Sequence, residues 1–259
     1  MKHSLTRSVL IVAGILALAA CGPARSQQLT VEVIRRLPHD QGAFTQGLLL
    51  HDGILYESTG LVGRSSLRAV DPTTGEVIRQ RDIPAPYFAE GLALVGDELL
   101  QLTYRAGKLF RWRAETFEPS AEQSYGGEGW GLCYDGESLW MSNGSAKLTR
   151  RDPQTFEVQD EITVERDGEQ VVRLNELECV NGAIYANVWL TDEIVRIDTK
   201  NGKVSATIDA SALYAELPDG LVRDAVLNGI AYDPERDLFL LTGKLWPSLF
   251  EVRFVPLDD

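Results

Sequence analysis

Glu90 has the clearest potential for chemistry in this sequence, because it lies within the apolar stretch PYFAEGLAL. An isolated buried carboxylate costs several kcal/mol unless it is paired or used. Four other segments carry a polar or aromatic residue at the equivalent position, just before an apolar run: Gln46, Trp130, Asn175 and Asn228. A carboxylate among amides and aromatic rings can move protons and hold a polar substrate.

A second set of residues closes the next apolar run of each segment: Thr59, Tyr104, Asn143, Trp189 and Lys244. Phe44 and Phe88 lie two residues before Gln46 and Glu90. If both sets meet, they form a polar centre inside an apolar box. The structural alternative is that the tryptophans pack between strands, the asparagines cap turns and the lysine is solvated.

These residues belong to five similar segments, whose anchor positions recur at intervals of 40–53 residues. The anchors are Gly47, Gly91, Gly131, Glu176 and Gly229. Asp-Gly, Gly-Asp or Asn-Gly pairs divide most segments into two strands joined by a tight turn. A second strand pair follows, with Asp71, Asp152 and Asp198 at its turn. A period of about 40 residues with four short strands indicates propeller blades.

The sequence therefore predicts an all-β fold, a five-bladed β-propeller with four-stranded antiparallel blades. The fifth unit stops after SLFEVRFV, residues 248–255, which would leave an unpaired edge. We expect the leading segment LTVEVIRRL, residues 29–37, to supply the missing strand and close the ring. One short helical stretch is expected, at Ser211–Glu216. In such a meander, first strands begin where second strands end, so both sets of residues should share one mouth.

The N-terminal segment has the pattern of an export signal. Lys2 and Arg7 precede an uncharged apolar run that is too short to span a membrane. The tetrapeptide LAAC, which ends at Cys21, resembles a bacterial lipobox, in which the cysteine is acylated. Ordinary cleavage after ALA, residues 17–19, is the alternative.

This pattern predicts three parts of the chain: a signal peptide at 1–20, a tether at 21–28, and one catalytic propeller domain at 29–259. The protein is expected to be exported to the periplasm and anchored to the membrane by a lipid on Cys21. A formal net charge of -13 argues against nucleic acid or an anionic membrane surface as a partner. The lipid anchor would then be the sole membrane contact.

Cys133 and Cys179 lie inside apolar runs of neighbouring repeats. Export would permit a disulfide, but we expect two buried thiols, because free cysteine behaves as a small hydrophobe. Two separated cysteines and three histidines, one of them in the signal, argue against a zinc site. No metal ligand is therefore assigned.

Eight motifs share a pattern with a known family: FTQGL (44–48), YESTG (56–60), FAEGL (88–92), GWGLCYDG (129–136), NELE (175–178), ANVW (186–189), VLNGIAYD (226–233) and TGKLWP (242–247). From about residue 29 to residue 256 the chain resembles the plant-type glutaminyl-peptide cyclotransferases, or glutaminyl cyclases, which have bacterial members. The resemblance also implies a five-bladed propeller. It further implies conversion of the N-terminal glutamine of peptides or proteins to pyroglutamate, with release of ammonia.

The resemblance also implies the roles of the site residues. Glu90, Asn175 and Lys244 would be catalytic, and the substrate would be bound by Phe44, Gln46, Phe88, Tyr104, Trp130 and Trp189. Tyr104 stands where a tryptophan is expected in the plant enzymes. Glu90 would transfer protons, while Asn175, Gln46 and Lys244 would hold the developing oxyanion. No cofactor is expected for catalysis, and a structural calcium ion in the channel stays open.

Two other classes of function also stay open. In metal-dependent lactonase-type propellers, a carboxylate and amides such as Glu90, Asn175 and Asn228 hold calcium or another divalent ion. Those propellers usually have six blades, against five anchors here. A non-catalytic lipoprotein propeller that binds proteins would not need one deep aromatic mouth.

Overall fold

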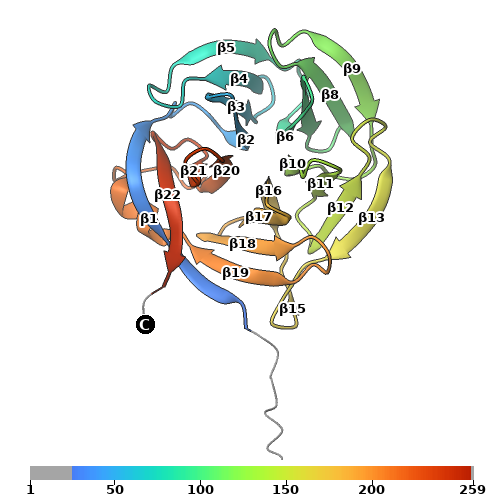
Figure 1. Cartoon of the computed structure of the whole chain (residues 1–259). Helices are drawn as coiled ribbons and strands as arrows, with labels where there is room; N and C mark the ends of the chain where they lie inside the picture. The colour runs from blue at the N-terminus through green and yellow to red at the C-terminus, as the bar shows by residue number, and fades with distance from the viewer. Residues whose placement is uncertain (1–24, 258–259) are drawn as a thin grey trace, which may run out of the picture.

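The computed structural model describes residues 25–257, which form β-strands arranged around a central axis (Figure 1). Over this range, hydrogen bonding gives one eight-stranded sheet, three four-stranded sheets and a two-stranded hairpin. The all-β class is therefore confirmed.

The three four-stranded sheets follow one another along the chain. The first contains β2 (Thr45–His51), β3 (Ile54–Thr59), β4 (Ser66–Val70) and β5 (Val77–Asp82). The second contains β6 (Ala89–Val95), β7 (Glu98–Thr103), β8 (Lys108–Arg113) and β9 (Pro119–Ser124). The third contains β10 (Leu132–Tyr134), β11 (Leu139–Ser142), β12 (Lys147–Arg151) and β13 (Val158–Thr163). The hairpin of β14 (Glu165–Arg166) and β15 (Glu169–Gln170) follows.

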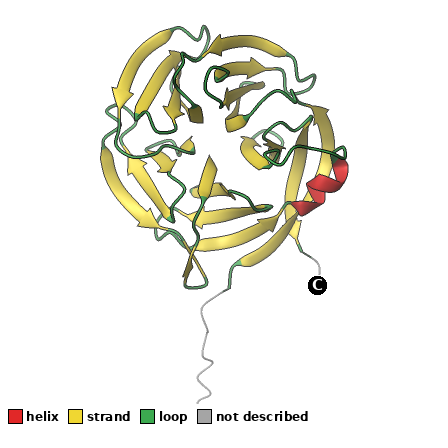
Figure 2. Cartoon of the chain, turned by 180° about the vertical axis from the view of Figure 1, so that it is seen from behind, coloured by secondary structure: helices red, strands yellow, loops and turns green. Residues whose placement is uncertain are grey.

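The eight-stranded sheet has the order β16-β17-β18-β19-β1-β22-β21-β20. Its strands are β1 (Gln27–Pro38), β16 (Leu174–Val180), β17 (Ala183–Val188), β18 (Glu193–Asp198), β19 (Val204–Asp209), β20 (Leu227–Asp233), β21 (Leu238–Gly243) and β22 (Ser248–Pro256). The predicted helical stretch is present as the 3-10 helix η1 (Ser211–Glu216), at the outer edge of the molecule (Figure 2).

The prediction of a five-bladed propeller built from five four-stranded blades is wrong. β1 does pair antiparallel with β22, with Pro38 opposite Ser248, as the unpaired edge suggested. It also pairs in parallel with β19, with Gln27 opposite Ala206, and this merges the last eight strands into one sheet. The strand begins at Gln27, so the last two residues of the predicted tether belong to it. Residues 1–24, with the predicted signal and lipobox, lie outside the described range.

The strands β2, β6, β10, β16 and β20, here called the inner strands, contact one another in cyclic order around the axis. Their approach is close enough to require glycine. A Cβ on Gly91 would lie 2.5 Å from the amide nitrogen of Leu132, and one on Gly131 would lie 2.0 Å from the carbonyl oxygen of Asn175. The repeated glycines of the sequence are thus explained by backbone contact between neighbouring inner strands.

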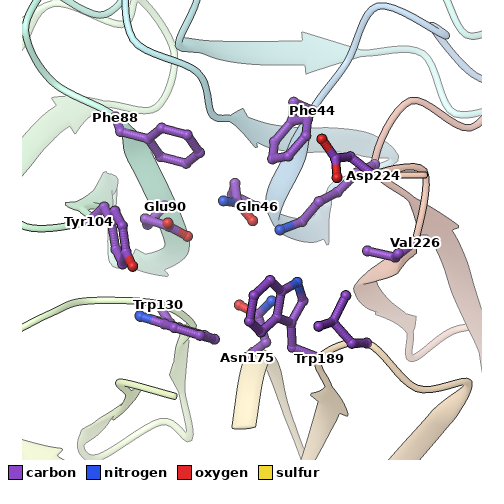
Figure 3. Close-up of a pocket in the computed structure, with 12 residues that line it drawn as sticks. Phe44, Gln46, Phe88, Glu90, Tyr104, Trp130, Asn175, Trp189, Asp224 and Val226 are labelled. Carbon is purple, nitrogen blue, oxygen red and sulfur yellow. The ribbon is translucent and has the colours of Figure 1, made fainter. Parts of the chain in front are cut away.

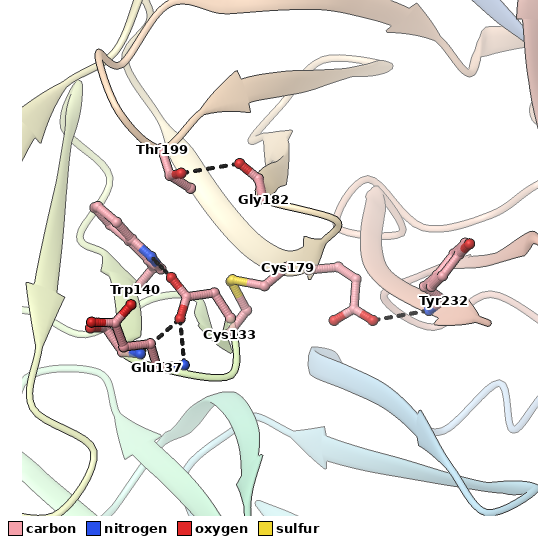
Figure 4. The surroundings of a disulfide bond; sticks show 10 residues. Cys133, Glu137, Trp140, Cys179, Gly182, Thr199 and Tyr232 are labelled. Carbon is pink, nitrogen blue, oxygen red and sulfur yellow. Dashed lines mark hydrogen bonds between the residues drawn. A yellow bond between two sulfur atoms is a disulfide. The ribbon is translucent and has the colours of Figure 1, made fainter.

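Apolar side chains pack between neighbouring sheets and form the core, as do Leu148, Leu177 and Val195 between the third sheet and β16–β18. Cys133 on β10 and Cys179 on β16 form a disulfide, with 5.5 Å between their Cα atoms (Figure 4). The expectation of two free thiols is therefore wrong, because adjacent inner strands bring the cysteines face to face. Within the described residues, no helix is long and apolar enough to cross a membrane.

Candidate active site

Four inner strands carry a register shift at the positions singled out in the sequence. The pairing of β2 with β3 shifts between Thr45 and Gly47, and that of β6 with β7 shifts between Ala89 and Leu92. Shifts in β16 and β20 bracket Asn175 and Asn228 in the same way. A bulge of this kind leaves a residue unpaired and redirects its side chain. It turns Gln46, Glu90 and Asn175 toward the end of the channel (Figure 3).

One cavity of about 200 Å³ lies at this end of the channel. It is lined by all nine residues predicted to catalyse or bind substrate: Phe44, Gln46, Phe88, Glu90, Tyr104, Trp130, Asn175, Trp189 and Lys244. The structure thus brings the predicted site residues together, while their chemical roles stay predictions. Each lies at the start of an inner strand or just beyond the end of the following strand.

Five aromatic rings form a continuous arc around the cavity (Figure 3). The successive ring centroids of Phe44, Phe88, Tyr104, Trp130 and Trp189 are 6.1, 5.9, 6.2 and 5.4 Å apart. These are distances at which edge-to-face aromatic pairs attract. Gly60 makes room for this wall, since a Cβ there would lie 2.4 Å from Cε1 of Phe88. The ring of Tyr104 belongs to this arc, so an aromatic ring is present at the position where a tryptophan is expected in the plant enzymes.

The arc leaves one side of the cavity to charged and aliphatic residues. Lys244, just after β21, is 5% exposed, and its Nζ lies 4.9 Å from the centroid of the Phe44 ring. Beside it, the cavity is lined by Asp224, Val226 and Leu190. Burial lowers the pKa of Lys244 to about 8, although the charges of Glu90 and Asp224 oppose this effect. Lys244 can therefore gain and lose a proton around pH 8.

Glu90 is the buried one of the two carboxylates that line the cavity, with 4% exposure, whereas Asp224 is exposed. Burial raises its pKa well above 4.5, the charge of Lys244 partly opposes this rise, and the charge of Glu128 adds to it. Within residues 25–257, no hydrogen bond stabilises the ionised form of Glu90. A carboxyl group with a raised pKa and free oxygens is suited to accept and return a proton.

The amide of Gln46 is oriented by Asn228. The Nδ2 of Asn228 donates to the carbonyl oxygen of Thr45 at 2.9 Å, and this bond identifies it as the amide nitrogen. The same nitrogen donates to Oε1 of Gln46 at 3.3 Å. The Nε2 of Gln46 is therefore the group left to donate a hydrogen bond into the cavity.

Glu128 fixes one section of the aromatic arc at the lip of the cavity. Its Oε2 accepts a hydrogen bond from the indole Nε1 of Trp130 at 3.1 Å, and its Oε1 accepts one from Nε of Arg105 at 2.8 Å. The guanidinium of Arg105 lies over the ring of Tyr104, 4.6 Å from its centroid. This carboxylate thus connects the second and third sheets at the mouth.

Three residues expected at the mouth do not line the cavity. The hydroxyl of Thr59 is hydrogen-bonded to Ser66, Asn143 closes its own turn through Ser145, and Asn228 lies behind Gln46. Sequence reasoning also missed Leu190, Asp224, Val226 and Glu128. A signal existed for two of them, since Val226 and Glu128 lie two residues before Asn228 and Trp130, as Phe44 does before Gln46.

The described part of the chain, residues 25–257, has no group of three or more His, Cys, Asp or Glu side chains arranged to hold a metal ion. Lys244, Asn175 and Gln46 bring an ammonium group and amides to the cavity, and Glu90 brings a buried carboxyl group. This arrangement is suited to an acyl transfer in which an oxyanion forms and a proton moves.

Comparisons with known proteins agree with this chemistry. A family described as glutamine cyclotransferase matches residues 7–254 of the chain. A glutaminyl-peptide cyclotransferase of Arabidopsis thaliana is 40% identical over 230 residues, which cover 86% of this chain and 71% of the relative. The crystal structure of Myxococcus xanthus glutaminyl cyclase is similar with a TM-score of 0.86 and 40% identity, over 90% of this chain and 100% of that one. The chain therefore belongs to the glutamine cyclotransferase family.

Proposed function

We propose that this protein converts the N-terminal glutamine of peptides and proteins to pyroglutamate and releases ammonia. Membership of the glutamine cyclotransferase family supports the reaction. The observation that carries the mechanism is the buried Glu90, whose ionised form no hydrogen bond from the described residues stabilises. It lies in a cavity that also contains an ammonium group and an aromatic wall.

In this reaction, the α-amino nitrogen of the substrate attacks its own side-chain amide carbon. A new carbon–nitrogen bond closes the five-membered ring, and the carbonyl oxygen becomes an oxyanion. The bond to the amide nitrogen then breaks, and that nitrogen leaves with an added proton as ammonia. Because both reacting groups belong to one molecule, the enzyme has to fix the folded rotamer and move protons.

Glu90 transfers the proton in this proposal. Its ionised form takes the proton released by the attacking amine, and the resulting acid donates it to the departing amide nitrogen. The net proton count of Glu90 is unchanged over one turnover. A raised pKa suits both steps, because it makes the carboxylate a stronger base toward the attacking amine and reduces its preference for the ionised form. Proton transfer of this kind is worth about 10²–10⁴-fold in rate.

Lys244, Asn175 and Gln46 hold the side-chain carbonyl and stabilise the oxyanion. Each has a donor at the cavity: an ammonium, a carboxamide, and the Nε2 that Asn228 orients. Donors fixed before the reaction act strongly where water is excluded. The aromatic arc encloses the aliphatic part of the glutamine and keeps competing water away from the amide carbon. No cofactor takes part in these steps.

The test is ammonia release from purified mature protein with several Gln-Xaa dipeptides, between about pH 6 and 9, a range that brackets the pKa of the substrate amine. We expect stoichiometric ammonia and a product lighter by one ammonia molecule. The same peptides with an acetylated α-amine are the matched control and should not react. No ammonia from any free-amine peptide would contradict the proposed function.

We also propose export and a lipid anchor on Cys21, on the basis of the apolar run and the LAAC sequence. Leu29 pairs with Pro256 and Pro38 pairs with Ser248, so β1 begins beside the last residues of β22. The turn at residues 244–247, here called the Lys244 turn, precedes the opposite end of β22. An anchor that precedes β1 would then leave the cavity facing away from the membrane. Mass spectrometry of the N-terminal peptide and membrane fractionation test the anchor. A Cys21→Ser variant should move to the soluble fraction, and unchanged fractionation would contradict lipidation of Cys21.

A further inference from the structure

A buried histidine joins two pocket-bearing segments of the chain. The side chain of His39 is 4% exposed. Its Nδ1 lies 2.7 Å from the carbonyl oxygen of Trp246, and its Nε2 lies 3.0 Å from Oε1 of Glu57 on β3. Neither the predicted site nor the proposed reaction uses this residue.

The partners of His39 determine its protonation state. A backbone carbonyl can only accept a hydrogen bond, so Nδ1 carries a proton. Glu57 accepts a hydrogen bond from Thr45 Oγ1 at 2.7 Å on the same oxygen that faces Nε2. A carboxylate oxygen in this setting accepts a second bond, so Nε2 also carries a proton. With both nitrogens as donors, His39 is an imidazolium paired with the buried carboxylate of Glu57.

The surrounding charges agree with this assignment. Burial alone would lower the pKa of His39, but the charge and hydrogen bond of Glu57, the Trp246 carbonyl and the charge of Asp40 outweigh it and raise the pKa. Burial alone would raise the pKa of Glu57, but His39, Arg68 and Thr45 outweigh it and lower the pKa. Arg68 Nη1 lies 3.8 Å from Glu57 and 2.8 Å from Asp40.

The histidine holds together the segments that carry three cavity residues. Trp246 belongs to the turn that begins with Lys244, and this turn is also held by a bond from Leu245 N to Ala43 O at 2.7 Å. His39 itself begins the loop between β1 and β2, residues 39–44, here called the Phe44 loop. This loop ends in Phe44, whose ring faces the Lys244 ammonium. Thr45, which donates to Glu57, lies between Phe44 and Gln46.

We propose that His39, as an imidazolium held by Glu57, is a positioning residue that fixes the Lys244 turn against the Phe44 loop. In this arrangement the Lys244 ammonium meets the oxyanion of the reaction. The inference rests on the function proposed above, and one of its tests does not depend on activity.

The first test is nitrogen nuclear magnetic resonance of the mature protein labelled at histidine. Both ring nitrogens of His39 should be protonated at neutral pH, with the signal assigned by its loss in His39→Gln. Deprotonation should occur above the ordinary histidine range, about pH 6.5. A neutral His39 ring at neutral pH would overturn the proposal whatever the enzyme does.

The second test is kinetic. His39→Gln should lower kcat about 10- to 100-fold with a smaller change in KM, since a small displacement of a catalytic group has that scale of effect. His51→Gln is the matched control, because the His51 side chain is 49% exposed on a distant hairpin. In a Lys244→Met background, His39→Gln should cause no further loss of the residual rate, because the group it positions is gone. An unchanged kcat in His39→Gln, or losses that multiply, would overturn the proposal.

If the His39→Gln variant does not fold, Glu57→Gln provides an alternative test of the proposal. It keeps an acceptor for Nε2 but removes the charge, so His39 should lose its proton at lower pH and kcat should fall with it. An unchanged His39 titration and an unchanged kcat would overturn the proposal. If the wild type releases no ammonia, the proposed function fails, while the resonance experiment still decides the state of His39.

Discussion

The mouth and the interior of the channel each contain a buried carboxylate, and the two have different hydrogen-bond partners. Glu90 is 4% exposed and has no hydrogen bond from the described residues to stabilise its charge. Glu176 on β16 is fully buried, and its two oxygens accept hydrogen bonds from the amide nitrogens of Leu48, at 3.2 Å, and Ile230, at 2.9 Å. Burial raises the pKa of both well above 4.5.

The difference lies in what surrounds the oxygens. The side chain of Glu176 on β16 accepts from backbone amides of β2 and β20, and Glu178 on the same strand accepts from the amide of Tyr232 at 3.0 Å. Burial raises the pKa of Glu178 to about 8. These oxygens are occupied by the fold, whereas those of Glu90 face the cavity. A raised pKa alone therefore does not distinguish the two carboxyl groups, whereas the access of their oxygens to the cavity does.

The largest expected effect comes from Glu90→Gln. This change keeps the size of the side chain but removes proton transfer, so kcat should fall by about 10²–10⁴-fold. The melting temperature should stay the same or rise, because a costly buried acid is removed without loss of a hydrogen bond. Ammonia release and thermal unfolding of one preparation measure both. Near-normal turnover in the folded variant would assign proton transfer to another group.

Removal of the disulfide should lower the free energy of unfolding and leave turnover at the mouth unaffected. The bond closes a loop across a sequence separation of 46 residues between β10 and β16. The Cys133→Ala, Cys179→Ala double variant should lose about 2–4 kcal/mol of unfolding free energy, because its unfolded chain is less constrained. Denaturant unfolding gives this value, and kcat of the folded fraction should match the wild type. Equal stability with and without reductant would argue against the bond.

Glu176→Gln is the counterpart of Glu90→Gln. The new amide group would face a backbone N–H, so one buried hydrogen bond is lost, at a cost of about 1–3 kcal/mol. Turnover of the folded protein should stay close to that of the wild type. Glu176→Gln should therefore lower the unfolding midpoint and leave kcat nearly unchanged. Glu90→Gln should instead lower kcat and leave the midpoint unchanged or higher. A large loss of kcat with an unchanged midpoint would make Glu176 part of the mechanism.

The pH dependence of kcat should report on Lys244. Its pKa is about 8, and its ammonium form is the one that stabilises an oxyanion, so kcat should decline as the pH rises above that value. Lys244→Arg should move this decline to higher pH, because arginine keeps its proton. Rate profiles of the two proteins at saturating substrate provide the comparison. An identical alkaline decline in both would point to a different group.

Chelation should have the smallest effect. A lactonase-type site would use Glu90 to bind a cation, whereas the proposed reaction needs the same carboxylate for protons and places Lys244 beside it. Exhaustive treatment with a chelator should therefore leave kcat unchanged, while an ion deeper in the channel would affect only the melting temperature. Activity lost on chelation and restored by one metal, at constant melting temperature, would support the metal-dependent alternative.

Local patterns in the sequence were enough to predict most strands and nine of the residues that line the cavity. Turn pairs such as Asp52-Gly53 and the apolar runs beside them depend on neighbouring residues, so β2 and β3 could be read directly. Asp71 caps its turn through bonds from Thr73 and Thr74, within three residues of itself. The repeat then placed Gln46 and Glu90 at the start of first strands and Lys244 just after a second strand, and these strand ends lie on the same side of the ring.

Tertiary structure alone decided the features that depend on residues far apart in the chain. The merger of β19 with β1 joins residues about 180 positions apart, and no local pattern encodes it. The same holds for the disulfide and for the bonds to Glu176 from Leu48 and Ile230, which distinguish this carboxylate from Glu90. Sequence patterns record which side chains are apolar or able to turn, whereas a hydrogen bond or a sheet edge is satisfied by whichever distant partner the fold brings within reach.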